Sequence, residues 1–260
     1  MTAPVLLNGQ GPYFFVVDTG ANQSVISAEV AAQLSLAPRG DETLNGVAGV
    51  QQAATTRASL GLGGHEESDV TLSILPGAAI GGAGMLGLDR LDGRNLTLDF
   101  GSQTLVIETK PHWRGGEDVI AVKARRRDGQ LTLVDADLAG IPVTAIIDSG
   151  AQNTVGNQAL RELAITRRPQ TFWSRTPIVS ATGQTIDADF AELPALRVGG
   201  LSLPNWPVAF ADLHTFQMWS LTRRPAILLG VDILSRFEWV CLDFVHDEVR
   251  FHLPDRGRTI

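Results

Sequence analysis

The feature that most constrains this chain is a short motif that occurs twice. Asp-Thr-Gly-Ala at residues 18–21 follows the apolar run Phe14–Val17, and Asp-Ser-Gly-Ala at residues 148–151 follows the apolar run Ala145–Ile147. The two aspartates lie 130 positions apart, half of the 260-residue chain. One Asp-Thr-Gly occurs by chance in many chains, whereas two copies that each close an apolar run are a strong signal. Internal repetition of this kind predicts two copies of one structural lobe.

Later landmarks repeat in the same order. Leu86-Gly87 is matched by Leu229-Gly230, and a Leu-Asp-Phe triplet at residues 98–100 is matched by a second one at residues 242–244. The triplets are 144 positions apart, so the second half must carry extra residues between its landmarks.

The largest of these insertions is Asp212–Pro225. It contains several large apolar side chains, where the first half has only the short, Gly-rich segment Pro76–Gly84. Two roles stay open for it, a wall of a cleft or a cap on the sheet.

The apolar runs that precede the two motifs are predicted to be strands buried on both faces. Such a strand should not end in an unpaired carboxylate, because a buried charge without partners is costly. Strong helix formers are scarce while Val, Ile, Leu, Thr and Gly are plentiful, which predicts a mainly β fold. We expect one helix at Ser27–Leu36, with Ser27 as its N-cap, and a matching helix at Asn157–Leu163.

Together, the two Asp-Thr/Ser-Gly-Ala motifs and their later Leu-Gly landmarks resemble the retropepsin-type aspartic peptidases. In that family two lobes each give one aspartate to a shared site, usually in a homodimer. This chain is similar to the bacterial two-lobed retropepsin-like proteases over nearly its whole length. The resemblance implies two β-barrel lobes related by a pseudo-twofold axis, each with one short helix after its motif. Residues 110–118, which contain Pro and Gly, form the expected linker between lobes at residues 1–109 and 119–260.

The sequence departs from the family pattern in two places. Retropepsins commonly carry an acidic residue after the Ala of the motif, where this chain has Asn22 and Gln152. They often have Arg after the later Gly, where this chain has Leu88 and Val231. These changes remove a supporting ion pair outside the catalytic atoms, so they bear on rigidity more than on chemistry.

The resemblance implies an aspartic endopeptidase with Asp18 and Asp148 as its catalytic residues. Two carboxylates held together cannot both ionise easily, so one of them keeps a proton. The charged member can take a proton from a water that attacks a peptide carbonyl, and the protonated member can stabilise the carbonyl oxygen. The hydroxyls of the two motifs are expected to reach the backbone of the opposite loop. The implied loop-supporting residues are Thr19, Gly20, Ala21, Ser149, Gly150 and Ala151.

Two Gly-rich stretches are candidates for hairpins that close over a substrate, which the family calls flaps. One spans residues 43–51 and the other residues 178–184. An ordinary surface hairpin is the alternative for each, but their comparable places in the two halves favour the flap interpretation. The candidate substrate-binding residues are Gly46, Val47, Ala48, Gly49, Ala181, Thr182 and Gly183.

The residue after the motif glycine bears on the working pH. In pepsin-like loops it is usually Ser or Thr, whose hydroxyl can donate to the outer oxygen of the carboxylate and lower the pKa. Here it is Ala21 in one motif and Ala151 in the other. The pair should therefore work in mildly acidic to near-neutral solution.

Composition argues against several other classes of protein. A net charge of −7 and an isoelectric point near 5.2 give no reason to expect nucleic acid or an anionic membrane as a partner, and Arg125–Arg127 is interpreted as a solvated cluster. No apolar stretch approaches the roughly 20 residues of a membrane helix. The five histidines are scattered, so we expect no metal and no cofactor. Cys241 is the only cysteine, and we expect it to be a buried packing thiol.

The expected partner is a protein or peptide substrate, and the active unit should be a monomer because both lobes lie on one chain. The resemblance alone favours a periplasmic or secreted location. Two other functions stay open, a non-catalytic peptide-binding module with the same fold and a glycosidase that uses the two carboxylates. A missing aspartate would favour the first, and matched Asp-Thr/Ser-Gly turns have no special reason to occur in the second.

Overall fold

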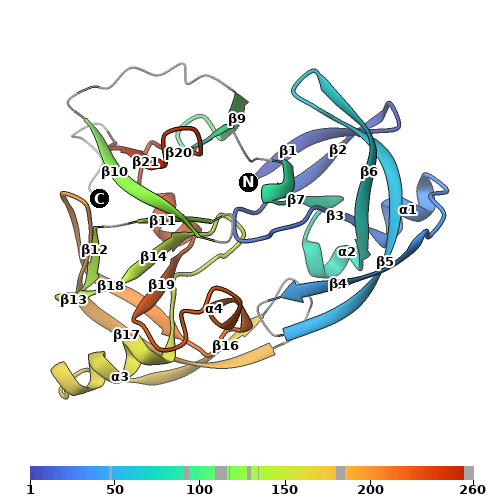
Figure 1. Cartoon of the computed structure of the whole chain (residues 1–260). Coiled ribbons are helices and arrows are strands. Elements are labelled where there is room, and N and C mark those ends of the chain that lie inside the picture. The colour runs from blue at the N-terminus through green and yellow to red at the C-terminus, as the bar shows by residue number, and fades with distance from the viewer. Residues whose placement is uncertain are drawn as a thin grey trace.

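The computed structural model describes residues 1–46, 49–90, 94–108, 116, 118–127, 130–133, 135–179 and 185–254. Strands dominate, and they form two lobes that lie side by side (Figure 1). The mainly β, two-lobed fold predicted from the repeat is confirmed. No helix among the described residues has both the length and the apolar character that crossing a membrane requires.

The first lobe is a seven-stranded sheet that closes on itself, because its first strand pairs with two partners. β1 (Thr2–Leu7) runs antiparallel to both β2 (Gln10–Val17) and β5 (Gly49–Leu62). Across the sheet the order is β1-β2-β7-β3-β6-β5-β4. The remaining elements of this lobe are β3 (Val25–Ser27), α1 (Ala28–Gln33), β4 (Gly40–Gly46), β6 (His65–Leu75), α2 (Gly77–Ile80), β7 (Gly84–Leu86) and the 3-10 turn η1 (Leu88–Arg90).

The second lobe repeats this plan with additions. Its strands follow the order β13-β12-β17-β18-β15-β19-β14-β11-β10, and β16 pairs with β17. The strands are β10 (Val119–Arg127), β11 (Gln130–Leu133), β12 (Ala136–Leu138), β13 (Ile141–Pro142), β14 (Thr144–Ile147), β15 (Val155–Gly156), β16 (Ser174–Val179), β17 (Thr185–Val198), β18 (Leu201–Phe210) and β19 (Ala226–Leu229). The helices are α3 (Gln158–Arg167), α4 (His214–Met218) and α5 (Val231–Leu234).

Two hairpins join the lobes in one shared sheet. β8 (Asn95–Asp99) pairs with β9 (Thr104–Glu108), and β20 (Trp239–Asp243) pairs with β21 (Glu248–His252). β8 and β20 run antiparallel, with Thr97 opposite Cys241 at the centre of their register. The Leu and Asp of each repeated Leu-Asp-Phe triplet lie at the ends of β8 and β20, so the two copies of this repeat pair with each other where the lobes join. Cys241 is buried there, as expected of a packing thiol.

Both predicted helices start at the expected cap and end elsewhere. The Ser27 hydroxyl accepts a hydrogen bond from the Val30 amide, and the Asn157 side chain accepts one from the Leu160 amide, as N-cap residues do. α1 ends at Gln33, short of the predicted Leu36, because Ser35 takes a left-handed backbone conformation with φ of 53°. α3 continues to Arg167, one turn beyond the prediction.

One prediction about burial is wrong for the first lobe and right for the second. Phe14 is 57% exposed and Val16 is partly exposed, while Phe15 and Val17 are fully buried, so β2 buries only one face here. In β14 the residues 145–147 are buried on both faces. The apolar run alone could not reveal the difference, because it depends on what covers the second face.

Most of the predicted linker lies outside the described residues, and so do Asp128 and Gly129, the two residues between β10 and β11. The strands that flank these two residues, β10 and β11, do pair antiparallel. Within the Arg cluster, the Arg126 guanidinium lies 2.8 Å from the Asp247 carboxylate, and both side chains are solvent-exposed.

We expect Leu98→Ala to lower the free energy of unfolding by about 2–5 kcal/mol, because Leu98 is fully buried where β8 joins the two lobes. Leu6→Ala, in a strand of the first lobe but 42% exposed, should cost less than about 1 kcal/mol. Denaturant unfolding of the two variants measures both values. Equal losses of unfolding free energy in the two variants would contradict the burial of Leu98 in the shared sheet.

Candidate active site

The two aspartates come at the ends of strands that occupy equivalent places. Asp18 follows β2, whose parallel neighbour is β7, and Asp148 follows β14, whose parallel neighbour is β19. The Asp18 amide donates to the Leu86 carbonyl and the Asp148 amide donates to the Leu229 carbonyl, each at 3.0 Å. Each neighbouring strand therefore holds the start of a motif loop in place.

The hydroxyls of the motifs cross between the lobes. The Thr19 hydroxyl donates to the Ile147 carbonyl at 2.9 Å, and the Ser149 hydroxyl donates to the Val17 carbonyl at 2.8 Å. Each hydroxyl also accepts from the other residue's amide, at 3.1 Å for Thr19 N to Ser149 Oγ and 3.0 Å for Ser149 N to Thr19 Oγ1. Four hydrogen bonds thus tie the two loops together, and both hydroxyl residues are buried.

Glycine is required in each motif because the opposite aspartate comes very close. A Cβ added to Gly20 would lie 2.6 Å from Cγ of Asp148, and one added to Gly150 would be closer still to Cγ of Asp18. Real Cβ atoms do not approach other heavy atoms this closely. The motif glycines therefore allow the two carboxyl groups to come within reach of each other.

Each carboxyl group is oriented by its own loop. Oδ1 of Asp18 accepts from the Gly20 amide at 2.8 Å and from the Ala21 amide at 3.1 Å. Asp148 repeats the pattern, with 2.9 Å to the Gly150 amide and 3.1 Å to the Ala151 amide. One oxygen of each carboxyl is thereby occupied, which leaves the other oxygen for chemistry.

Burial and mutual repulsion raise the proton affinity of the pair. Loss of solvent and the neighbouring Asp148 carboxyl raise the pKa of Asp18 to about 8. Burial also raises the pKa of Asp148, against the backbone amides of its loop. Because each carboxyl group affects the pKa of the other, the proton belongs to the pair. Such a pair can hold one proton and one negative charge over a wide pH range.

Each loop has a further supporting contact, between a hydroxyl and a carboxylate, that the sequence analysis did not predict. The Ser24 hydroxyl donates to Asp89 at 2.7 Å, and the Thr154 hydroxyl donates to Asp232 at 2.8 Å. The same hydroxyls accept from the amides of the landmark glycines, at 3.0 Å in the first lobe and 3.2 Å in the second. A Ser or Thr three positions after the motif Ala, with an Asp two positions after the later Gly, was the available signal.

The two candidate flap stretches both lie in hairpins, although their tips are not described. β4 and β5 pair antiparallel up to Gly46 opposite Gly49, and β16 and β17 pair up to Val179 opposite Thr185. Both hairpins run along the same edge of the molecule (Figure 1). The candidate residues Val47, Ala48, Ala181, Thr182 and Gly183 lie outside the described residues.

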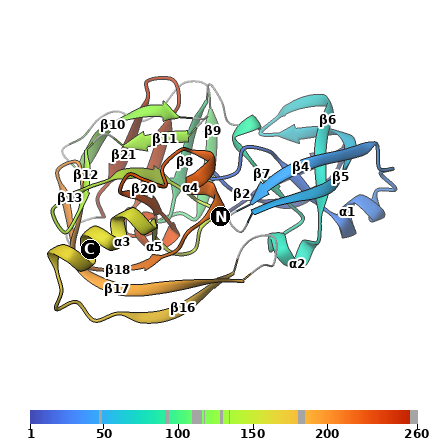
Figure 2. The ribbon, with the colours of Figure 1, turned by 60° about the horizontal axis from the view of Figure 1, so that its bottom comes forward.

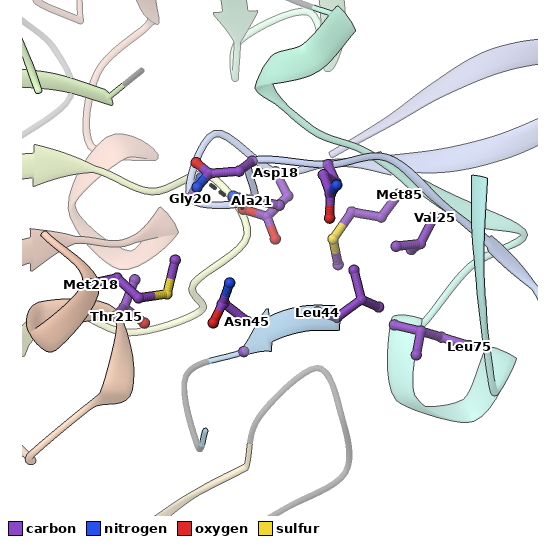
Figure 3. A pocket seen from close by; sticks show the side chains of 13 residues that line it. Asp18, Gly20, Ala21, Val25, Leu44, Asn45, Leu75, Met85, Thr215 and Met218 are labelled. Atoms are coloured by element: carbon purple, nitrogen blue, oxygen red, sulfur yellow. Dashed lines mark hydrogen bonds between the residues drawn. The ribbon is translucent and has the colours of Figure 1, made fainter. Parts of the chain in front are cut away.

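A pocket opens between the Asp18 loop and the β4–β5 hairpin (Figure 3). Apolar side chains from the first lobe form one side of it, and helix α4 of the second lobe forms the other (Figure 3). Asp18 is the only ionisable residue among the described residues that line it. Other residues that line it include Val25, Leu44, Leu75, Met85, Thr215 and Met218.

The insertion Asp212–Pro225 takes both of the roles left open by the sequence. Leu213, Phe216, Trp219 and Leu221 are buried within the second lobe. The other side of α4 lies beside β4 in both views (Figure 1 and Figure 2).

Other candidate positions take part in packing. Asp99 and Asp243 lie in the shared sheet, and the Asp243 carboxylate accepts hydrogen bonds from the Val245 and His246 amides. His252 stacks on Trp239 with ring centroids 5.1 Å apart. Among the described residues, no three His, Cys, Asp or Glu side chains gather in a way that could hold a metal ion.

Comparison with known families gives one match in each half of the chain. The family described as "gag-polyprotein putative aspartyl protease" matches residues 3–92, and the family described as "Aspartyl protease" matches residues 134–233. Each match contains one Asp-Thr/Ser-Gly motif and its Leu-Gly landmark. A comparison with curated proteins found no match.

We expect Gly20→Ala and Gly150→Ala each to lower the free energy of unfolding by about 1–3 kcal/mol, because each new methyl group must push the opposite aspartate away. Denaturant unfolding monitored by fluorescence measures the loss. Gly200→Ala is the matched control, since a Cβ there meets no atom within 4 Å, and it should change stability by less than about 0.5 kcal/mol. If the motif variants were as stable as the control, the close approach of each motif glycine to the opposite aspartate would be incorrect.

Proposed function

Because the chain belongs to the aspartyl proteases and carries their domain twice, we propose that it is an endopeptidase that uses both motif aspartates together. In this proposal a water bound between Asp18 and Asp148 attacks the carbonyl carbon of a peptide bond. The observation that carries the proposal is the cross-lobe network, which holds two proton-sharing carboxyl groups face to face.

The proposed mechanism divides the work between the two carboxyl groups. The ionised carboxylate accepts a proton from the water as its oxygen bonds to the carbonyl carbon. The protonated carboxyl donates its hydrogen bond to the carbonyl oxygen, where negative charge develops. The tetrahedral intermediate then collapses, the C–N bond breaks, and the pair gives the leaving amine one proton, which replaces the proton that the carboxylate took from the water. The pair ends the cycle with one proton, as it began.

Backbone amides support this division of roles. Each Oδ1 is held by two amides of its own loop, so the outer oxygens are the ones that would face water and substrate. A fixed orientation of this kind matters because a misplacement of about 1 Å can cost 100-fold in rate.

The assembly and the hairpins complete the proposal. One chain supplies both aspartates, so the active unit needs no second subunit. The hairpins β4–β5 and β16–β17 act as flaps that close over a peptide in the cleft. Export to the periplasm or out of the cell stays a prediction from the family resemblance alone.

The two other functions fit less well. Glycosidases hold their two carboxyl groups about 5 Å or more apart, with sugar or water between them, whereas here the two loops are so close that neither motif glycine has room for a Cβ beside the opposite carboxyl group. A peptide-binding module without catalysis would not need a pair of carboxyl groups with raised pKa values.

We expect Asp18→Asn and Asp148→Asn each to abolish cleavage of peptides while the chain stays folded, because either change removes one of the two required protonation states. Cleavage of denatured casein or a peptide library, with and without a pepstatin-type inhibitor, measures activity, and circular dichroism checks the fold. Asp69→Asn is the control, since Asp69 is an exposed partner of Arg57 and its loss should leave the rate unchanged. Appreciable turnover by either dyad variant would exclude the two-aspartate mechanism.

The pH dependence should respond to the alanines that follow the motif glycines. The raised pKa of Asp18 predicts activity in mildly acidic to near-neutral solution. In the double variant Ala21→Ser with Ala151→Ser, added hydroxyl donors would stabilise the ionised form. A hydrogen bond to a charged group is worth about 1.5–3 kcal/mol and a pKa unit about 1.4 kcal/mol. With competition from water, we expect the profile to move toward acid by about one unit.

The measurement is kcat/KM against pH on a peptide without ionisable groups. The double variant Ala21→Gly with Ala151→Gly adds no donor and serves as the control for packing changes. An optimum near pH 2–3 in the wild type, or no acid shift in the serine variant alone, would show that other groups set the proton affinity of the pair.

A further inference from the structure

The apolar residues that line the pocket have counterparts in the second lobe. Val25 starts β3 four positions after the motif Ala, as Val155 starts β15. Met85 precedes the Leu-Gly landmark in β7, as Leu228 does in β19. The strand registers place two further pairs of residues at equivalent positions. Leu44 of β4 corresponds to Ile178 of β16, and Leu75 at the end of β6 corresponds to Ala211, directly after β18.

The two sets of residues have different surroundings. In the first lobe they form a small apolar cluster that lines the open pocket beside Asp18. In the second lobe the counterparts pack in one cluster with the side chains of the insertion, including fully buried Phe216 and Trp219. The insertion therefore occupies, on the Asp148 side, the place that is a pocket on the Asp18 side.

The strands that precede the motifs show the same difference. Ile146 of β14 belongs to the cluster filled by the insertion and is fully buried. Its counterpart Val16 in β2 is only partly buried. In the first lobe the segment Pro76–Gly84 stands at the place of the insertion, and it offers only Ala, Gly and one Ile after its Pro. Ile80 packs into the apolar cluster of the first lobe, and the Ala and Gly residues around it are too small to fill the space that remains as the pocket.

Helix α4 also completes the pocket that stays open. Its Thr215 and Met218 side chains face the first-lobe residues across the pocket (Figure 3). A ring nitrogen of His214, at the start of α4, lies 3.4 Å from the side-chain oxygen of Asn45 on the β4–β5 hairpin. The insertion thus fills one pocket and forms a wall of the other.

Thr215 adds a buried polar residue to the α4 side of this pocket. Its side chain is 7% exposed, and its hydroxyl has no hydrogen-bond partner among the residues that the structure describes.

We propose that this site selects an apolar side chain on one side of the scissile bond only, the side bound between the Asp18 lobe and α4. The inference rests on the proposed peptidase function. The pocket fits side chains such as Leu, Met or Phe, because Leu44, Leu75 and Met85 line one side of it and Asp18 is the only ionisable residue among its described lining. On the other side of the bond, Phe216 and Trp219 already fill the equivalent place, so residues of many kinds are accepted there.

Cleavage-site profiling on a peptide library tests the selectivity of the wild type. We expect a strong preference for Leu, Met or Phe at one position next to the cleaved bond and no comparable preference at the position across it. A matching apolar preference on both sides, or on neither, would overturn the inference.

Paired variants assign the preference to the pocket. Leu44→Ala should lower kcat/KM for a peptide with Phe at the selected position by about tenfold relative to one with Ala, because removed pocket contacts are worth about 1–3 kcal/mol. Met218→Ala should shift the preference in the same way. Ile178→Ala, at the counterpart of Leu44 in the second lobe, should change the ratio less than twofold. Equal effects of Leu44→Ala and Ile178→Ala would contradict the assignment.

Binding separates this inference from the proposed function. Calorimetry with the Asp148→Asn variant measures the affinity for the same peptides without turnover. If the wild type cleaves no peptide, the proposed function fails, and one-sided selection in binding still supports the pocket assignment. If the wild type cleaves peptides but neither cleavage nor binding depends on an apolar residue on one side, only the inference fails.

Discussion

The rest of the structure depends on the hydrogen bonds that the Thr19 and Ser149 hydroxyls make across the junction of the lobes. Each hydroxyl donates to a carbonyl of the opposite lobe and accepts from the opposite motif amide. A buried hydroxyl that both donates and accepts a hydrogen bond recovers within the protein the hydrogen bonds that it loses to water on burial. The distance between the lobes and the distance between the aspartates are therefore set by the same four contacts. Any movement of one lobe against the other would move the carboxyl groups as well.

Around these hydrogen bonds the two lobes have the same strands and motif loops, and they differ in the segments that pack over them. The strands, the motif loops and the hydroxyl–carboxylate contacts at Asp89 and Asp232 are repeated almost unchanged. The first lobe leaves one face of β2 and the pocket beside Asp18 open, while the second lobe covers both equivalents with its insertion. A duplicated lobe can keep its catalytic geometry and still lose the symmetry of its binding surface, because different residues control the two.

Much of this arrangement could be predicted from the sequence, because the repeat is explicit. The motif at residues 18–21 and its second copy predicted the two lobes and the paired aspartates, and Ser27 was predicted separately as an N-cap. Three features were not predicted, because they depend on contacts between distant residues. The full burial of Ile146, whose counterpart Val16 is only partly buried, depends on the insertion. The support by Ser24 and Thr154 depends on carboxylates 65 and 78 positions away, and the pairing of β8 with β20 joins opposite halves of the chain.

The shared sheet also bears on the order in which the chain can fold. Thr97 and Cys241 pair across 144 positions, and the motif hydroxyls meet across about 130. Closing such long loops costs entropy before any contact repays it, so these pairings should form after each lobe has made its local hairpins. During synthesis the first lobe leaves the ribosome well before β20 exists. A newly made chain would then carry Asp18 without Asp148 folded against it, and under the proposed two-aspartate mechanism it would cleave no neighbouring chain until the second lobe had formed.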